Sequence, residues 1–328
     1  MRVATIDIGT NTVLLLIAER RADGALVALD ERATITRLGE GVDVNRRLSA
    51  AAIARTEACL DAYAEVVGNL CAERIAVVGT SAMRDAAGGE ELARHIQSAF
   101  GVAVRIVSGS EEARLTFRGA LGGLDAAEHA ELAVFDIGGG STEVVFGRLG
   151  AGRPTVEYGA SFDIGSVRLT ERHVSHDPLT ADEFGALSRA AREAFAAVPP
   201  LRSPHPPFGI AGTMTTLAAI ELGLSPYDGA RVHGHTMKRD ELRRVVDRLA
   251  RVDLDSRRRI AGMEPKRADV IVAGGCIALA LLDHWNVNDV VISDRGVRWG
   301  LAAELAEEHG DPSIRNVFDS LPHTRGSR

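Results

Sequence analysis

The chain has 328 residues, of which 45% are hydrophobic and 25% are charged, and its formal net charge at pH 7 is −7. These proportions exclude a disordered chain and are typical of a globular protein long enough for two domains. The acidic balance argues against nucleic acid as the main partner. The three cysteines form no closely spaced pair, which favours free thiols and a cytoplasmic location. The longest apolar run, residues 268–282, carries Asp269 and is too short to span a membrane.

The first predicted element is a hairpin over residues 5–16, in which an apolar strand ends at Asp7-Ile8-Gly9 and a second apolar strand follows a few small polar residues. Short apolar strands then alternate with amphipathic helices, which predicts an α/β domain with a largely parallel sheet. In chain order we expect strands over residues 25–30 and 31–39, a helix capped by Ser49, a strand over 75–78, a helix around 92–100, a strand over 102–107 and a helix over 108–121.

A glycine pair and a charged stretch, residues 122–131, predict a boundary between two halves. We therefore expect an N-terminal domain over residues 1–124, a C-terminal domain over 125–308 and a polar tail over 309–328, with the first domain as the tail's candidate packing partner. Later in the second half, the predicted elements are strands over 155–158, 208–211 and 290–293 and helices over 166–173, from Thr180 with a capping box, and over 240–251, 270–284 and 297–308.

Residues 132–146 repeat the design of the first hairpin. An apolar strand ends at Asp136-Ile137-Gly138, the same tripeptide as Asp7-Ile8-Gly9, and the residues that follow are Gly-Gly-Ser-Thr-Glu and another apolar run. Three consecutive glycines weaken a strand or helix, so they indicate close approach of the backbone to a bulky anionic group. Two such hairpins predict two similar halves that face each other across a cleft.

The two hairpins resemble the phosphate-binding hairpins of the actin-like ATPase superfamily. That resemblance implies two ribonuclease-H-like (actin-like) α/β domains whose mixed, mostly parallel sheets face an interdomain cleft. Six short segments, weak singly but in the right order, are similar to those of the exopolyphosphatase/guanosine pentaphosphate phosphohydrolase family. These segments are residues 7–12, 79–84, 108–113, 136–143, 211–213 and 293–298.

The family resemblance implies roles for four acidic residues. Glu112 would be the general base that activates a water, although the helix dipole alone also favours carboxylates at Glu111 and Glu112. Asp136 and Glu143, with Asp7, would surround a Mg²⁺ ion, because hard carboxylate oxygens suit magnesium better than zinc.

The same resemblance implies a phosphate-binding set. Hydrolysis of a phosphoanhydride needs stabilisation of charge on the transferred phosphoryl group, which backbone N–H groups and a guanidinium supply. Arg84 would grip a phosphoryl group in a two-pronged contact. The other predicted phosphate-binding residues are Gly9, Thr10, Asn11, Gly138, Gly139, Gly140, Ser141, Gly212 and Thr213.

Several polar residues receive no assigned role from the sequence. His233 and His235 lie in a predicted loop, and the sequence does not decide whether they contact the substrate or have a structural role. The run Arg257–Arg259 is interpreted as a solvated face that could attract a polyphosphate tail. The histidines and aspartate of residues 173–177 are interpreted as a surface loop rather than a metal site.

The sequence therefore predicts a Mg²⁺-dependent phosphohydrolase that releases terminal orthophosphate from inorganic polyphosphate, or the 5′ γ-phosphate of guanosine pentaphosphate. Larger family members carry additional C-terminal helical domains that this sequence lacks, so we expect short polyphosphate chains, or a homodimer that builds a channel between subunits. Two alternatives remain: an ATP-dependent kinase or ATPase on the same fold, and a non-catalytic sensor of guanosine tetraphosphate or pentaphosphate. The four acids argue against the sensor, because a binding site has little need of a base.

Overall fold

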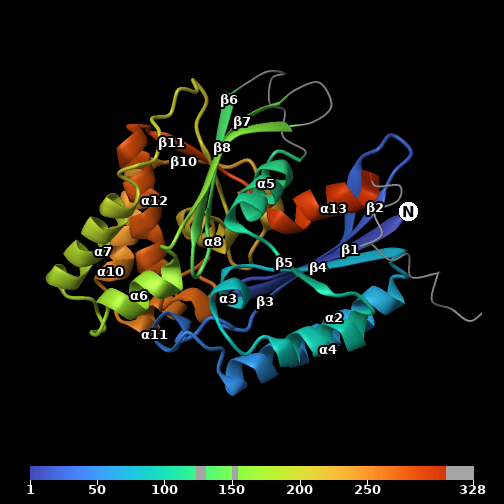
Figure 1. The fold of residues 1–328 in the computed structure, drawn as a ribbon. Coiled ribbons are helices and arrows are strands. Elements are labelled where there is room, and N and C mark those ends of the chain that lie inside the picture. Colours follow the sequence, from blue (N-terminus) through green and yellow to red (C-terminus); the bar gives the residue numbers. More distant parts are fainter. Residues whose placement is uncertain (123–130, 150–153, 308–328) are drawn as a thin grey trace, which may run out of the picture.

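The computed structural model describes residues 1–122, 131–149 and 154–307, which form two α/β lobes, each built on one sheet (Figure 1). The first sheet has the strand order β3-β2-β1-β4-β5, and the second has the order β10-β11-β9-β6-β7-β8. The strands of the first sheet are β1 (Arg2–Ile8), β2 (Thr12–Arg20), β3 (Leu26–Ile35), β4 (Arg74–Gly79) and β5 (Val104–Ile106). Those of the second are β6 (Glu131–Ile137), β7 (Thr142–Leu149), β8 (Pro154–Phe162), β9 (Phe208–Ile210), β10 (Thr236–Lys238) and β11 (Asp289–Ile292).

The second sheet repeats the plan of the first. Read from β8, the second sheet runs through the third, second, first and fourth strands of its lobe, as the first sheet does, and β11 and then β10 complete it at the far edge. The turns of the two hairpins also close with the same hydrogen bond: the Gly9 amide donates to the Thr12 carbonyl, and the Gly138 amide to the Ser141 carbonyl, each at 3.0 Å. The predicted pair of similar halves with an actin-like arrangement is therefore confirmed.

Both sheets are mixed, as predicted, but they are less parallel than the sequence indicated. Among the described strands, two of the four pairs of neighbouring strands in the first sheet are parallel, and two of the five pairs in the second sheet are parallel. The reason is that each sheet opens with three strands joined by short connections, and such strands pair antiparallel. The strands expected over residues 25–30 and 31–39 are in fact the single strand β3, whose register with β2 shifts at Ile17 and Ala18.

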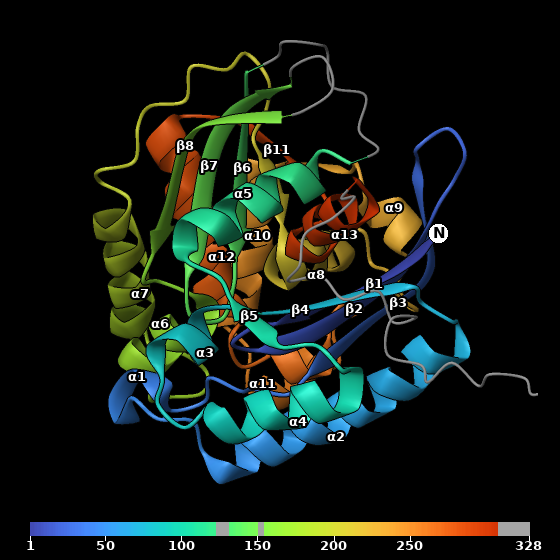
Figure 2. The same cartoon turned by 45° about the vertical axis from the view of Figure 1, so that its right-hand side comes forward.

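Helices cover the outer face of each sheet. In the first lobe α2 and α4 pack beneath the sheet, and in the second lobe α6, α7, α10 and α12 form a layer beside it (Figures 1 and 2). The predicted caps are confirmed, because the side chains of Ser49 and Thr180 accept hydrogen bonds from backbone amides of the first turns of α2 and α7. These helices are α2 (Ala50–Asn69), α4 (Glu90–Phe100), α6 (Ser166–His173), α7 (Ala181–Ala194), α10 (Arg239–Ala250) and α12 (Ile271–Trp285).

Two helices lie between the sheets and join the lobes. Helix α5 (Gly109–Ala120) packs Phe117 into an apolar cluster with strands of the second sheet, and α13 (Val297–Glu307) packs Trp299 against strands of the first. The two helices also pack closely on each other (Figure 2). The division of the chain at residue 124 stays a prediction, and each of these helices packs on the sheet of the opposite half. Residues 123–130 and the tail over 309–328 lie outside the described residues.

The remaining short elements were not expected from the sequence. They are α1 (Val42–Asn45), α3 (Ser81–Asp85), α8 (Ala211–Glu221), α9 (Gly229–Val232), α11 (Leu254–Arg258) and a 3-10 turn over Pro265–Arg267. Most are four or five residues long, too short to show a hydrophobic period. Helix α8 is longer, but most of its residues, Thr213 and Thr216 included, are buried, so its sequence does not alternate between a polar and an apolar face. Among the described residues, no helix combines the length and the apolar character needed to cross a bilayer.

Candidate active site

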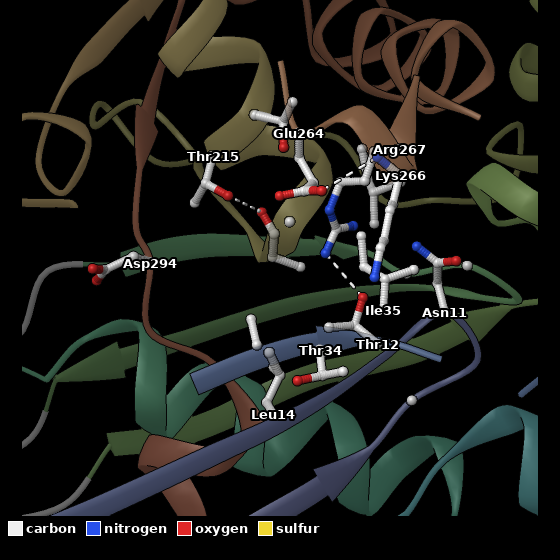
Figure 3. Close-up of a pocket in the computed structure, with 18 of the residues that line it drawn as sticks. Asn11, Thr12, Leu14, Thr34, Ile35, Thr215, Glu264, Lys266, Arg267 and Asp294 are labelled. Atoms are coloured by element: carbon white, nitrogen blue, oxygen red, sulfur yellow. Dashed lines mark hydrogen bonds between the residues drawn. The ribbon is translucent and has the colours of Figure 1, made fainter. Parts of the chain in front are cut away.

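A cleft with a volume of about 1010 Å³ lies between the two lobes. Figure 3 shows it from within: Thr12 and Leu14 of β2 and Thr34 of β3 form one wall, and Thr215, Lys266 and Arg267 of the second lobe form the other. The turns of both hairpins, residues 9–12 and 138–141, also line it. The cleft predicted from the repeated hairpins is therefore present.

The four acidic residues that the sequence singled out, Asp7, Glu112, Asp136 and Glu143, all line this cleft, and Glu31, Glu264 and Asp294 line it as well. The two strands of the second hairpin pair Asp136 directly with Glu143. Like charges on directly opposite residues destabilise a sheet, so this pair has a cost that the fold must offset. In the first hairpin, Asp7 is opposite Leu14. The two hairpins therefore share a backbone design, but only the second carries an acidic pair.

The protonation of these acids reflects their crowding. Burial raises the pKa of Asp7 to about 7, and the Glu143 carboxylate adds to the rise while Arg298 opposes it. Burial, followed by repulsion from Glu143 and Asp7, also raises the pKa of Asp136 and of Glu112 well above their ordinary values. Burial raises the pKa of Glu143, against a hydrogen bond from Ser161 Oγ to Glu143 Oε1 at 2.7 Å. Such a group of acids is stabilised by a bound cation.

Glu112 is directed into the cleft and Glu111 is not. The Ser108 hydroxyl caps α5 by accepting from the Glu111 amide, which places both glutamates in the first turn. The Glu112 side chain is 8% exposed and accepts a hydrogen bond from Arg84 Nη1 at 3.0 Å. Glu111 instead forms an ion pair with Arg105 at 3.4 Å on the outside. The helix dipole therefore accounts for a carboxylate at either position, but only Glu112 reaches the cleft.

The three glycines have a packing reason that the sequence did not reveal. A Cβ atom on Gly139 would lie 3.2 Å from side-chain atoms of Thr10 and Asn11, and one on Gly140 would lie 2.6 Å from the Ser81 hydroxyl. Close approach is therefore required between the two hairpin turns, whether or not a ligand is bound. The Gly138 amide is already used within its turn, whereas those of Gly139 and Gly140 donate no hydrogen bond within the described part of the chain.

The donors present fit a magnesium ion that is only partly held by protein. Asp7 Oδ1 is buried and lacks a hydrogen-bond partner within the described residues, which leaves this oxygen available to a cation. In that same part of the chain, no three side chains of the coordinating types converge into a ready-made metal site. Mg²⁺ usually keeps several waters and binds through one or two carboxylates together with substrate phosphates. Asp7, Asp136 and Glu143 fit that kind of site.

Most of the predicted phosphate-binding residues line the cleft, and two do not. Those that line it are Gly9, Thr10, Asn11, Gly138, Gly139, Gly140, Ser141 and Gly212. Arg84 lies beside the cleft and points to Glu112 instead. Thr213 is buried, and its hydroxyl donates to the Ile137 carbonyl at 3.0 Å, which ties α8 to the end of β6. Thr213 therefore positions the second turn from behind.

Lys266 and Arg267 are among the basic residues of the cleft wall that sequence reasoning missed. The Arg267 guanidinium crosses the cleft, where Nη2 donates to Thr12 Oγ1 of the first lobe at 2.9 Å (Figure 3). It lies so close to Gly212 that a Cβ there would be 2.2 Å from the Arg267 Cζ atom. The available signal was compositional, since Lys266 is one of only two lysines in the chain.

The unassigned polar residues have mainly structural partners. The interpretation of residues 257–259 as a solvated face is wrong for Arg257, which is 2% exposed and paired with Asp177, whereas Arg258 and Arg259 line the cleft. His233 lies 3.0 Å from Asp294, and His235 lies 2.5 Å from Glu221. These two histidines therefore tie loops to helices.

Comparison with known proteins gives consistent matches along the chain. The model of the Ppx/GppA phosphatase family matches residues 16–309. Exopolyphosphatase 2 of Mycobacterium tuberculosis is 38% identical over 321 residues, which span 93% of this chain and 98% of that protein. The guanosine-5′-triphosphate,3′-diphosphate pyrophosphatase of Vibrio atlanticus is 26% identical over 318 residues, spanning 95% of this chain and 61% of that protein. The solved Aquifex aeolicus member of the Ppx/GppA family has a TM-score of 0.79 at 33% identity, covering 94% of this chain and 99% of that one.

Proposed function

The chain belongs to the Ppx/GppA phosphatase family, and on that premise we propose that it is a phosphohydrolase acting on terminal phosphoanhydride bonds. Its substrates are inorganic polyphosphate, the 5′ γ-phosphate of guanosine pentaphosphate, or both. The observation that carries the proposal is the gathering of Asp7, Glu112, Asp136 and Glu143 around one cleft whose wall also holds Lys266 and Arg267. Hydrolysis of a phosphoanhydride needs carboxylates that bind a metal ion, a carboxylate that acts as a base, and basic side chains that attract the polyanionic substrate. The cleft contains all three kinds of group.

Glu112 acts as the base in this proposal. Its carboxylate orients a water in line with the leaving oxygen and accepts the water's proton as the new bond to phosphorus forms. Arg84 supports the role, because its hydrogen bond to Glu112 Oε2 fixes the carboxylate and favours its charged form. Burial and the neighbouring acids act in the opposite sense and raise the pKa of Glu112, which suits a group that must take up a proton.

The turn over Gly138–Ser141 binds the terminal phosphate through its free amides. The amides of Gly139 and Gly140 are held in place by packing against the first hairpin, so they need no rearrangement when charge develops on the phosphoryl oxygens. Mg²⁺, held by Asp136 and Glu143 with Asp7 close by, would neutralise phosphate charge and offset the repulsion among the acids.

The volume of the cleft favours short substrates. About 1010 Å³ is the size of a pocket for a nucleotide or a short oligophosphate, so long polyphosphate would extend beyond it. We expect faster release of orthophosphate from short oligophosphates than from long chains. The opposite preference would support a channel built between two subunits, as in a homodimer.

A phosphate-release assay tests the proposal directly. Orthophosphate is measured from polyphosphates of several lengths, guanosine pentaphosphate and ATP, each with Mg²⁺ and with a chelator. We expect Mg²⁺-dependent release from polyphosphate or guanosine pentaphosphate that exceeds release from ATP. Turnover of ATP alone would favour the kinase or ATPase, and tight guanosine tetraphosphate binding without hydrolysis of any substrate would favour the sensor.

A further inference from the structure

A chain of alternating charges runs from Glu112 to the contact between the lobes. Arg84 Nη1 lies 3.0 Å from Glu112 Oε2, and Arg84 Nε lies 3.4 Å from Asp85 Oδ1. On the other side of Asp85, Oδ2 accepts a hydrogen bond from Arg168 Nη2 at 3.3 Å. Arg168 Nε lies 3.4 Å from Asp43 Oδ1. We refer to these five residues, Glu112, Arg84, Asp85, Arg168 and Asp43, as the ionic relay.

The ionic relay crosses from one lobe to the other at Arg168. Asp43 lies on α1 and Asp85 on α3, both in the first lobe, whereas Arg168 lies on α6 of the second (Figure 2). The Arg168 side chain is only 7% exposed and also lies 3.2 Å from Asp163. A buried guanidinium is stable only while its carboxylate partners are in place. The relay is therefore complete only when the two lobes hold their present relation.

The backbone of Arg168 is bound to the proposed phosphate turn. The amides of Val167 and Arg168 donate to the Gly139 carbonyl at 2.9 and 3.1 Å, and the Ser166 amide donates to the Gly138 carbonyl at 2.9 Å. The first turn of α6 thus rests on the glycine turn, and its Arg168 side chain extends from there to Asp85. Arg168 therefore contacts the turn that would bind phosphate through its backbone, and it contacts Asp85, the partner of Arg84, through its side chain.

We propose that Arg168 is a positioning residue for Glu112, acting through Asp85 and Arg84. Asp85 has two cationic partners, Arg168 and Arg84, and Arg84 has two acidic partners, Asp85 and Glu112. With Arg168 present, Asp85 is neutralised and Arg84 remains on Glu112. Without Arg168, the Asp85 charge attracts Arg84 and draws it away from Glu112, so the base loses its orientation. This inference rests on the proposed function, in which Glu112 is the base.

The neighbouring Arg172 provides a matched control on the same helix. Its Nε and Nη2 atoms bind both oxygens of Asp43 at 2.6 and 2.7 Å, so it contributes to the same lobe contact. It has no contact with Asp85 in the described part of the chain. Arg172→Gln therefore removes an interlobe ion pair of equal charge and leaves the link to Arg84 intact.

The test compares the kcat and KM of phosphate release for Arg168→Gln and Arg172→Gln, well below their melting temperatures. We expect Arg168→Gln to lower kcat roughly 10- to 100-fold with KM nearly unchanged, because a small misplacement of a catalytic group has effects of that size. Arg172→Gln should keep kcat within about twofold of the parent protein. Equal losses of kcat in both variants would overturn the proposal, because they would show that the loss comes from a weakened contact between the lobes and not from the link between Arg168 and Arg84.

A second variant separates positioning from general structural damage. Adding Asp85→Asn to Arg168→Gln removes the charge that competes for Arg84, so the double variant should recover most of the lost kcat. A double variant as slow as Arg168→Gln would contradict the relay.

A crystal structure of Arg168→Gln gives a readout that does not depend on activity. The Arg84 guanidinium should have moved from Glu112 toward Asp85, and an unchanged Arg84–Glu112 pair would overturn the proposal even if the parent protein releases no phosphate. Inactivity of the parent protein on every substrate would reject the proposed function alone.

Discussion

Arg84, on α3, donates a hydrogen bond to Glu112, in the first turn of α5, with 3.0 Å between the nitrogen and the oxygen. The sequence indicated a phosphate contact for Arg84 and a base for Glu112, and the fold joins the two in an ion pair. An arginine in this position fixes the carboxylate in the absence of substrate. Its partner Glu112 lines the cleft, so phosphoryl oxygens bound there would compete with Glu112 for the N–H groups of Arg84.

The first prediction concerns the base. Glu112→Gln should lower kcat by about 10²- to 10⁴-fold, because an amide cannot accept the proton of the attacking water. KM should change little, since the phosphate turn and the basic wall are untouched. Steady-state phosphate release measures both constants. Glu111→Gln is the matched control, because its side chain pairs with Arg105 outside the cleft and its loss should leave kcat within about twofold. Parallel loss of substrate binding and turnover in Glu112→Gln would reject the role of base.

The second prediction concerns the acidic pair of the second hairpin. In the presence of a chelator, Asp136→Asn should raise the melting temperature, because it removes a charge directly opposite the buried Glu143. The same variant should lose Mg²⁺-dependent activity. Asp289→Asn, a partly buried strand carboxylate outside the cleft, should show neither effect. Thermal melts with chelator and with Mg²⁺ measure the melting temperatures of both variants. A lower melting temperature of Asp136→Asn than of the parent protein in the presence of chelator would show that Asp136 and Glu143 do not destabilise the fold by repulsion.

The third prediction concerns pH and metal removal. The pKa of Asp7 is about 7 in the folded protein against an ordinary value of 3.8, so the folded state binds this proton more tightly than the unfolded state. The stabilisation is complete below about pH 4 and is lost as pH rises toward about 7. The free energy of unfolding of metal-free protein should therefore decline over that range, by an amount on the order of a few kcal/mol.

Mg²⁺ should reverse this decline, because it binds the deprotonated acids. Its stabilising effect should be large at pH 8 and small at pH 5. Denaturant unfolding with chelator and with Mg²⁺ measures both curves. Asp7→Asn serves as the control and should flatten the decline in the chelated protein, and an unaltered slope would assign the pH dependence to other groups.

The fourth prediction concerns the packing of α5 on α13. A Cβ atom on Gly300 would lie 2.0 Å from the Leu115 carbonyl oxygen, so Gly300→Ala forces the two helices apart. We expect a loss of about 3 kcal/mol or more in the free energy of unfolding. Gly68 is the control, since it also lies in a helix but a Cβ there would meet nothing within 4 Å. Gly68→Ala should stabilise the protein by up to about 1 kcal/mol. Equal effects in denaturant titrations would contradict the close-packing explanation.

The regular elements could be predicted well from the sequence because their signals are local. Ser49 and Thr180 were identified as the caps of α2 and α7, and the helices predicted over 240–251 and 270–284 agree with the bounds of α10 and α12 to within about one residue. The predictions failed where the signal was short or absent, as for α1, α3 and α11, which have four or five residues. The division of residues 25–39 into two strands was wrong: Leu26–Ile35 form one strand, whose register with β2 shifts between Ile17 and Ala18.

The sequence by itself determined the repeated Asp-Ile-Gly hairpins and, with them, the cleft and its acids, because the same local pattern folds the same way twice. Only the tertiary structure decided which partner each of those residues has. It directed Glu112 inward and Glu111 outward, and it brought Arg84 to Glu112, Thr213 behind the glycine turn and Arg267 across to Thr12. The physical reason is that these contacts join segments up to 255 residues apart, and a pairing between two lobes leaves no period, cap or spacing in the chain itself.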